Sequence, residues 1–149
     1  MAVAVIDASV ALKWQLNDEE CVQQAITLRD DFIKNEEPRL YAPSLWTYEI
    51  INGLVMAMRR GRITEVDARE SLEDILALGI KEKKPEPLQI YALAQKHGIS
   101  AYDAAYLALA ESERAEFWTG DNELYQRVSS KLAWVKWIGD YPGKKGLIN

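Results

Sequence analysis

Apolar positions along the chain follow two different spacings, and the two alternate from one segment to the next. Short apolar runs typical of buried strands occupy 2–6, 40–42, 116–121 and 133–138, and a brief strand is expected from Ile80. Apolar side chains recur at helical spacing over 18–34, 44–60, 64–78, 88–96, 101–113 and 123–131, and a short first helix is expected from about Val10. Strands alternating with helices predict an α/β fold with a mainly parallel central sheet flanked by helices.

The chain is organised as one domain. Its 149 residues are enough for a single substantial core, and they contain no internal repeat or low-complexity linker. We expect the domain to cover 1–140 and a C-terminal tail with little pattern to cover 141–149. Thr64 is the expected cap of one helix, and Gly61 and Gly79 are expected helix ends.

The composition is that of an ordinary globular protein, with 48% hydrophobic and 28% charged residues. Neither a long uncharged apolar segment nor a signal-peptide pattern is present, which predicts a cytoplasmic location without a membrane. The single Cys21 excludes an internal disulfide and is expected inside a helix. The single His97 is expected as a structural cation at a helix C-terminus, which disfavours a histidine-based nucleophilic triad.

The net charge of -5 argues against a broadly basic nucleic-acid surface. A cluster of carboxylates nevertheless lowers the net charge while creating a demand for divalent cations, and a bound cation reverses the local field. Basic stretches at 59–62 and 81–84 are each typical of solvated surface charge. The charge balance therefore does not exclude a phosphate-bearing substrate that is bound together with a metal ion.

Four acids stand where they can converge. Asp7 and Asp121 each follow a predicted strand, and ligands of open α/β sheets bind outside the carboxyl ends of the strands. Glu49 lies among apolar residues of a predicted helix, with Asn52 three positions later on the same face, and Asp103 lies in a first helical turn. Taken singly, each acid has another explanation: a helix cap for Asp7, a surface acid for Glu49, and a residue favoured by the helix dipole for Asp103.

The four acids together favour a metal site. Like charges in one crevice repel unless the carboxyl groups are protonated or neutralised by a metal ion. Ligands that are all oxygen favour Mg²⁺ or Mn²⁺ over zinc.

The motifs around these acids resemble those of the PIN-domain ribonucleases, and within them the VapC toxins of toxin–antitoxin pairs. The matching segments, in chain order, are Val5-Ile6-Asp7-Ala8-Ser9, Tyr48-Glu49-Ile50-Ile51-Asn52, the run at 100–110, and Phe117-Trp118-Thr119-Gly120-Asp121. The run at 100–110 is the most specific of the four. The resemblance covers nearly the whole chain and implies a single PIN-like α/β/α domain.

The resemblance also implies the chemistry and the roles of the acids. Asp7 and Asp103 would be the principal Mg²⁺ ligands, Asp121 would complete the pocket directly or through water, and Glu49 would bind a metal or orient the attacking water. The supporting polar positions would be Ser9, Asn52 and Thr119. The reaction would be hydrolysis of RNA phosphodiester bonds, with single-stranded or looped RNA entering the groove more easily than a duplex.

Partners follow from the same resemblance. It implies a homodimer and a cognate VapB-type antitoxin that covers the acidic pocket, with a basic side chain inserted among the carboxylates. Candidate phosphate contacts are Lys13, Arg59, Arg60 and Arg62. Trp14 and Trp46 suit base stacking or core packing, and core packing is the preferred interpretation.

Three other functions compete with the nuclease. Haloacid-dehalogenase phosphatases expect a second Asp two residues after the first, where this chain has Ser9. Receiver domains need paired acids and a late strand-end lysine, which the sequence does not display. The third alternative is a catalytically inactive PIN-like module that binds RNA or protein, although all four acids are present.

Overall fold

The computed structural model describes residues 2–142, and these form a five-stranded sheet with helices on both sides. The strands are β1 (Val3–Ile6), β2 (Arg39–Pro43), β3 (Lys81–Lys83), β4 (Glu116–Thr119) and β5 (Val135–Trp137). They are ordered β3-β2-β1-β4-β5, and every pairing is parallel. The predicted α/β fold with a parallel sheet is therefore confirmed.

The strand order places a switch point beside the central strand. After β1 the chain builds the sheet outward through β2 and β3, and it then returns to the other side of β1 with β4 and β5. Val5 pairs with Tyr41 on one side and with Phe117 on the other. In such sheets the ligand crevice opens at the carboxyl ends of the two strands at the switch point, which are β1 and β4 here.

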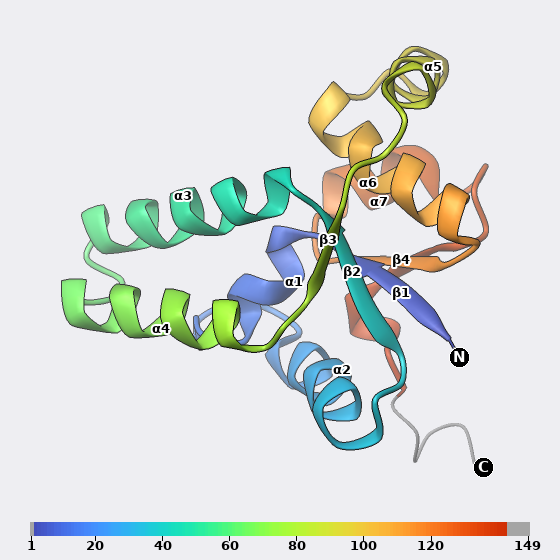
Figure 1. Cartoon of the computed structure of the whole chain (residues 1–149). Coiled ribbons are helices and arrows are strands. Elements are labelled where there is room, and N and C mark those ends of the chain that lie inside the picture. Colours follow the sequence, from blue (N-terminus) through green and yellow to red (C-terminus); the bar gives the residue numbers. More distant parts are fainter. Residues whose placement is uncertain (1, 143–149) are drawn as a thin grey trace.

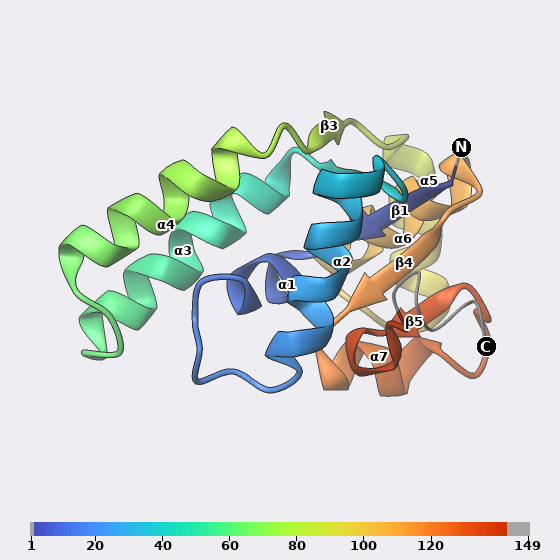
Figure 2. The same cartoon turned by 90° about the horizontal axis from the view of Figure 1, so that it is seen from below.

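Seven helices connect the strands within the described residues. They are α1 (Ala8–Lys13), α2 (Val22–Asn35), α3 (Leu45–Arg59), α4 (Glu65–Ala77), α5 (Pro87–His97), α6 (Ala101–Glu113) and α7 (Asn122–Val128), followed by a 3-10 turn at Ile138–Asp140. Helices α1 and α2 lie on one side of the sheet and α5 and α6 on the other (Figures 1 and 2). Helices α3 and α4 form a hairpin that projects beyond the carboxyl ends of the strands (Figure 1).

Helix α6 forms the centre of the core. Its residues from Ala104 to Ala110 are all buried, and it contacts β1, β2 and β4. A helix that is buried on all sides is expected to be apolar throughout, and its alanines let it approach the sheet closely. Trp14 and Trp46 are also buried, which confirms core packing for both.

Several element boundaries differ from the sequence predictions. The helix expected from 18 begins at Val22, because Cys21 adopts a left-handed conformation with φ 58° and precedes the helix. The prediction that Cys21 lies inside a helix is therefore wrong. The last helix ends at Val128 instead of 131, and the last strand covers only Val135–Trp137. Thr64 caps α4 as predicted, accepting a hydrogen bond from the Asp67 N–H at 3.1 Å.

His97 occupies a different environment from the one predicted. Its side chain is buried, with 8% exposed, and neither ring nitrogen has a hydrogen-bond partner among the described residues. Burial lowers the pKa of His97, which favours the neutral ring. His97 ends α5 and has a structural place, as predicted, but its burial disfavours the predicted positive charge.

Of the predicted tail at 141–149, residues 143–149 lie outside the described part of the structure. Among the helices that are described, none has the length and apolar character needed to cross a membrane.

Candidate active site at the carboxyl ends of β1 and β4

Asp7 lies at the switch point, directly after the central strand. Its Oδ1 accepts a hydrogen bond from the Ser9 hydroxyl and a longer one, at 3.3 Å, from the Val10 N–H, while its Oδ2 accepts one from the Thr119 hydroxyl. Asp7 thus caps α1 and belongs to the crevice at the same time. The side chain is only 7% exposed, and burial raises its pKa to about 6 against the opposing effect of the hydrogen bonds.

The segment after β4 is joined closely to α1. The Gly120 N–H donates to Ser9 Oγ at 2.8 Å, and the Asp121 N–H donates to Thr119 Oγ1 at 3.0 Å. A Cβ atom on Gly120 would lie 2.5 Å from Lys13 Cε and 3.1 Å from Ser9 Oγ. A side chain here would displace Lys13 and crowd Ser9, which binds Asp7.

Asp121 and Asp103 line a pocket of about 230 Å³ beside this junction. Asp121 Oδ1 accepts from the Leu124 N–H at 3.1 Å and caps α7. Asp103 lies in the first turn of α6, where its N–H donates to Ser100 Oγ at 3.0 Å. Burial, followed by the negative charge of Asp121, raises the pKa of Asp103. The two acids therefore lie close enough to repel each other.

Glu49 reaches the same region from α3. Its Oε1 accepts a hydrogen bond from the hydroxyl of Tyr106, a residue of α6. Burial raises the pKa of Glu49, and the charges of Asp103 and Asp121 raise it further. Sequence reasoning did not single out Tyr106, although its spacing of three from Asp103 on one helix indicates a shared face.

The structure brings all four predicted acids into one electrostatic neighbourhood. The negative charge of Asp121 contributes to the raised pKa of Asp7, and the charges of Asp103 and Asp121 contribute to that of Glu49. Within residues 2–142, no three acid, histidine or cysteine side chains already stand at the spacing of a metal site. The fit to a divalent cation therefore rests on donor chemistry: all the donors are oxygens, and their ionisation is opposed by burial and by mutual repulsion.

The other predicted residues fall into two groups. Ser9 and Thr119 contact Asp7 directly, whereas Asn52 is exposed on α3. Lys13 is 4% exposed, and its Nζ lies 3.9 Å from Glu19 Oε1.

Three arginines were also predicted to contact phosphate. Arg62 is bound to Asp18 at 2.6 Å and to Glu19 at 2.8 Å. Arg59 and Arg60 are exposed at the opposite end of α3 from Glu49, roughly 15 Å along the helix axis. Arg59 and Arg60 therefore lie apart from Glu49, and Arg62 is engaged by two acids.

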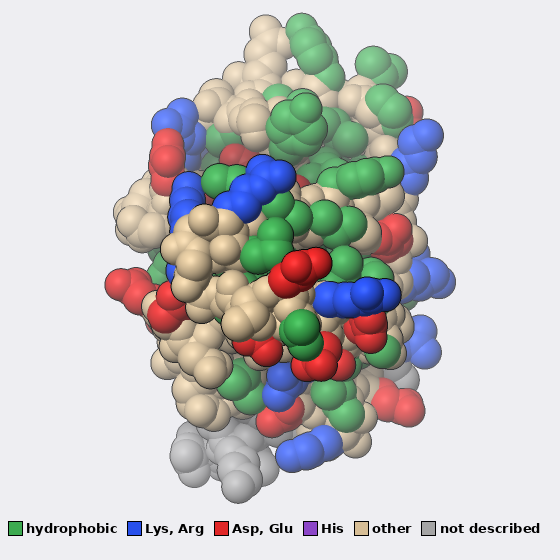
Figure 3. All heavy atoms as spheres, turned by 90° about the vertical axis from the view of Figure 1, so that its left-hand side faces the viewer, with side chains coloured by type: hydrophobic (Ala, Val, Ile, Leu, Met, Phe, Trp, Pro, Cys, Tyr) green, Lys and Arg blue, Asp and Glu red, His purple; other side chains and the backbone are tan. Residues whose placement is uncertain are grey.

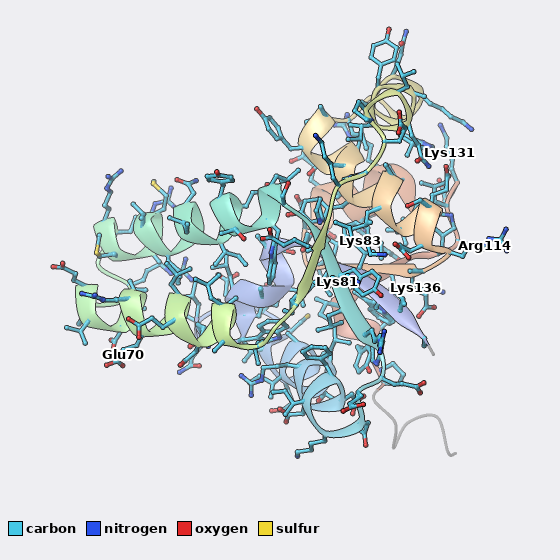
Figure 4. All side chains as sticks on the ribbon, in the orientation of Figure 1. Glu70, Lys81, Lys83, Arg114, Lys131 and Lys136 are labelled. Carbon is cyan, nitrogen blue, oxygen red and sulfur yellow. The ribbon has the colours of Figure 1, made fainter. Side chains whose placement is uncertain are left out.

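The basic stretch at 81–84 includes the edge strand β3. Lys81 and Lys83 project from β3, and Arg114 and Lys136 lie near the opposite edge of the sheet (Figure 4). Lys83 is paired with Glu113 at 2.6 Å, and its Nζ lies 4.7 Å from the centre of the Tyr41 ring. These contacts support the interpretation of this stretch as surface charge.

Comparison with known proteins gives consistent matches over most of the chain. The PIN domain family model matches residues 4–130. Ribonuclease VapC3 of Pyrobaculum aerophilum is 31% identical over 127 residues, which cover 83% of this chain and 92% of that protein. Ribonuclease VapC9 of Mycobacterium tuberculosis is 33% identical over 120 residues, covering 80% of this chain and 87% of that protein.

Solved structures agree with the sequence matches. The crystal structure of PAE2754 from Pyrobaculum aerophilum matches with a TM-score of 0.67 and 28% identity, covering 89% of this chain and 91% of that one. Mycobacterium tuberculosis VapC20, a toxin that cleaves the sarcin-ricin loop, matches with a TM-score of 0.60 at 12% identity, covering 89% of this chain and 98% of that one. The second likeness concerns the fold alone.

Proposed function

The chain belongs to the PIN domain family, among the VapC ribonucleases, and on this premise we propose that it is a Mg²⁺-dependent endoribonuclease acting as the toxin of a toxin–antitoxin pair. The observation that carries the proposal is the convergence of Asp7, Glu49, Asp103 and Asp121 at the switch point of the sheet. We propose a cytoplasmic location, where its RNA substrate is found.

The acids have distinct parts in this proposal. Asp7, Asp103 and Asp121 would hold Mg²⁺ or Mn²⁺, and Glu49 would hold a metal or orient the attacking water. A bound divalent ion polarises a phosphoryl group and lowers the pKa of a coordinated water. Ser9 and Thr119 hold Asp7 in one orientation through their hydroxyls, which reduces the reorganisation needed when the substrate binds.

The bond change is hydrolysis at phosphorus. Water oxygen attacks the phosphorus atom, the bond from phosphorus to the 3′ oxygen breaks, and the products carry a 5′-phosphate and a 3′-hydroxyl. Glu49 keeps one carboxylate oxygen, Oε2, that makes no hydrogen bond to another described residue, and this oxygen would accept a proton of the water. Asn52, exposed one helical turn after Glu49, would contact the RNA backbone.

The substrate would be single-stranded or looped RNA. A pocket lined by carboxylates repels phosphate, so RNA binding at the acids should depend on the divalent ion. Lys13, Arg59, Arg60 and Arg62 stay candidate phosphate contacts, and among them Lys13 lies nearest the acids, against Gly120.

We propose that a second copy of the chain covers an exposed apolar patch beside the acids. Candidate contact residues are the exposed apolar side chains of Tyr48 and Ile51 on α3, Leu88 and Tyr91 on α5, and Tyr102 on α6. Figure 3 shows hydrophobic side chains gathered over the upper part of the face that includes α3. Large apolar side chains concentrated on one face mark protein interfaces more often than solvated surface. Light scattering of the wild type and of Tyr91→Asp tests this, with a monomeric wild type contradicting it.

The antitoxin partner would be a VapB-type protein that inserts a basic side chain among the four carboxylates. Such a contact would neutralise the pocket in the way the metal ion does and would block the substrate. Co-purification with the product of a neighbouring small gene is the expected result, and an active enzyme found without any such partner contradicts it.

The alternative is an inactive PIN-like module that binds RNA or protein. The buried Asp7 argues against it, because ionising a buried carboxyl group costs free energy and an uncharged Ser could cap α1 equally well. The favoured function and this alternative differ in their need for a divalent ion.

Cleavage of a mixed cellular RNA pool tests the proposed function. The assay compares Mg²⁺, Mn²⁺ and chelator for the wild type, Asp7→Asn and Asp103→Asn, with Asp74→Asn on the exposed face of α4 as the matched control. We expect metal-dependent cutting by the wild type and the control and none by the two site variants. A pure, antitoxin-free wild type that neither cuts RNA nor binds metal contradicts the proposal and favours the inactive module.

A further inference from the structure

Tyr106 occupies a position beneath the acids that neither the sequence motifs nor the family assignment gives a role. Its side chain is 2% exposed, and its ring stacks on that of Phe117 with centroids 5.8 Å apart and planes 22° apart. Phe117 lies in β4, two residues before Thr119, which binds Asp7. The ring is therefore fixed by the same strand that fixes Asp7.

The hydroxyl of Tyr106 points from the core into the acid cluster. It donates to Glu49 Oε1, and this is its one hydrogen bond to another described residue. The buried, stacked ring leaves the hydroxyl directed at Glu49. Toward a carboxylate, which only accepts, a neutral phenol acts as the donor, and its ring fixes where that donor lies.

This contact restricts what Glu49 can do. With Oε1 bound from below, Glu49 has Oε2 for a metal ion or for the attacking water. Without this hydrogen bond the long Glu49 side chain could adopt several rotamers, because α3 leads away from the sheet (Figure 1). The stacked ring therefore connects Glu49 to the core through the Tyr106 hydroxyl.

We propose that Tyr106 is a positioning residue that orients Glu49 so that a single carboxylate oxygen faces the metal and the attacking water. The inference rests on the proposed nuclease function and deepens it. Because the Tyr106 side chain is buried, it acts through Glu49 and does not touch RNA. Partners of this kind, which orient a ligand by hydrogen bonding, typically contribute tenfold to a hundredfold in metal affinity or rate.

Tyr106→Phe removes the hydroxyl and keeps the stacked ring. Tyr41→Phe is the matched control, because Tyr41 is also buried but lies in β2 and packs against Lys83. Mn²⁺ affinity is measured by calorimetry, and kcat and KM by cleavage of an RNA oligonucleotide that the wild type cuts. For Tyr106→Phe we expect a tenfold to hundredfold weaker Mn²⁺ affinity or lower kcat, with KM for RNA unchanged. Tyr41→Phe should match the wild type in all three quantities.

A double-mutant cycle distinguishes a loss of Glu49 positioning from a general loss of folding. In a Glu49→Gln background the further effect of Tyr106→Phe on Mn²⁺ affinity should shrink to less than twofold, because Tyr106 acts through the Glu49 carboxylate. An equal effect in both backgrounds overturns the proposal, as does a Tyr106→Phe variant with wild-type Mn²⁺ affinity and kcat. A wild type that neither binds Mn²⁺ nor cuts RNA overturns the proposed function itself, and this inference with it.

Discussion

Asp7 and Asp121 occupy equivalent places in the chain but different environments in the fold. Each follows a parallel strand and caps the next helix, Asp7 through the Val10 N–H and Asp121 through the Leu124 N–H. Asp7 is buried and receives two further hydroxyl hydrogen bonds, whereas Asp121 is exposed at the pocket. One local pattern therefore places both acids at the crevice, and burial together with the hydroxyls of Ser9 and Thr119 makes them chemically different.

The difference follows from the position of the two strands. β1 is the central strand, with β2 on one side and β4 on the other, so Asp7 follows a strand that has two neighbours on each side. β4 lies one strand further out, and its end opens toward α7 and the pocket with Asp103. We therefore expect Asp7 to be the less replaceable acid.

Replacing each acid by its amide gives the largest expected effect. Asp7→Asn should lower the cleavage rate by about two to four orders of magnitude, since it removes a fixed charge that no water can replace. Asp121→Asn should lower it by about ten- to a hundredfold, because solvent reaches its place. Initial rates at saturating Mn²⁺ measure both, and equal losses in the two variants would remove the distinction between the acids.

The dependence of stability on pH separates the two acids next. The pKa of Asp7 is about 6 in the folded protein, above its ordinary value of 3.8, so the folded state binds this proton more tightly than the unfolded state. Its contribution is fully present below about pH 4 and is lost as pH rises through about 6, with a total of about 3 kcal/mol.

Urea unfolding between pH 4.5 and 7.5 measures this loss without added metal. Wild type and Asp121→Asn should both lose stability over this range, whereas Asp7→Asn should lose clearly less. Parallel curves for wild type and Asp7→Asn would show that Asp7 is ionised at its ordinary pKa.

Thr119→Val tests the hydroxyl that connects the two acids. Thr119 donates to Asp7 and accepts from the Asp121 N–H, so its loss should raise the pKa of Asp7 further and loosen the start of α7. We expect a ten- to a hundredfold lower cleavage rate. Thr27→Val is the control, because the Thr27 hydroxyl donates only to the Gln23 carbonyl within α2, and it should cleave at the wild-type rate. Equal rates for both variants would place the hydroxyl outside the mechanism.

The smallest expected effect distinguishes the charge of Asp121 from its role as the N-cap of α7. Asp121→Asn keeps a good N-cap side chain and Asp121→Ala does not, so the alanine variant should be less stable by about 1 kcal/mol. Both variants lack the charge and should cleave at similar rates. Thermal unfolding and initial rates provide the two readouts, and a much lower rate for the alanine variant alone would mean that the cap, not the charge, supports cleavage.

Sequence patterns located the fold and the four acids because both depend on local rules. Strand ends and helix faces are readable from apolar spacing, and Asp7 and Asp121 each follow such a strand. The role of Tyr106 was not readable, because its partner Glu49 lies 57 residues away and the contact exists only in the assembled core. The close packing of Gly120 on Lys13 is likewise a tertiary contact.

The errors have the same physical origin. The sequence around Cys21 does not indicate a left-handed backbone, so the start of α2 was predicted too early. His97 follows the rule for a helix end, but burial against neighbouring elements overrides the dipole. Local rules therefore predict where a residue lies along its element better than what surrounds it.

Anomalous diffraction from crystals of the protein grown with MnCl₂ tests the central claim most directly. The account predicts a manganese peak bonded to Asp7 and Asp103, with Asp121 and Glu49 bound to it directly or through water, and no such peak in Asp7→Asn crystals. A wild-type structure without manganese among these four acids, at a concentration that supports RNA cleavage, would contradict it.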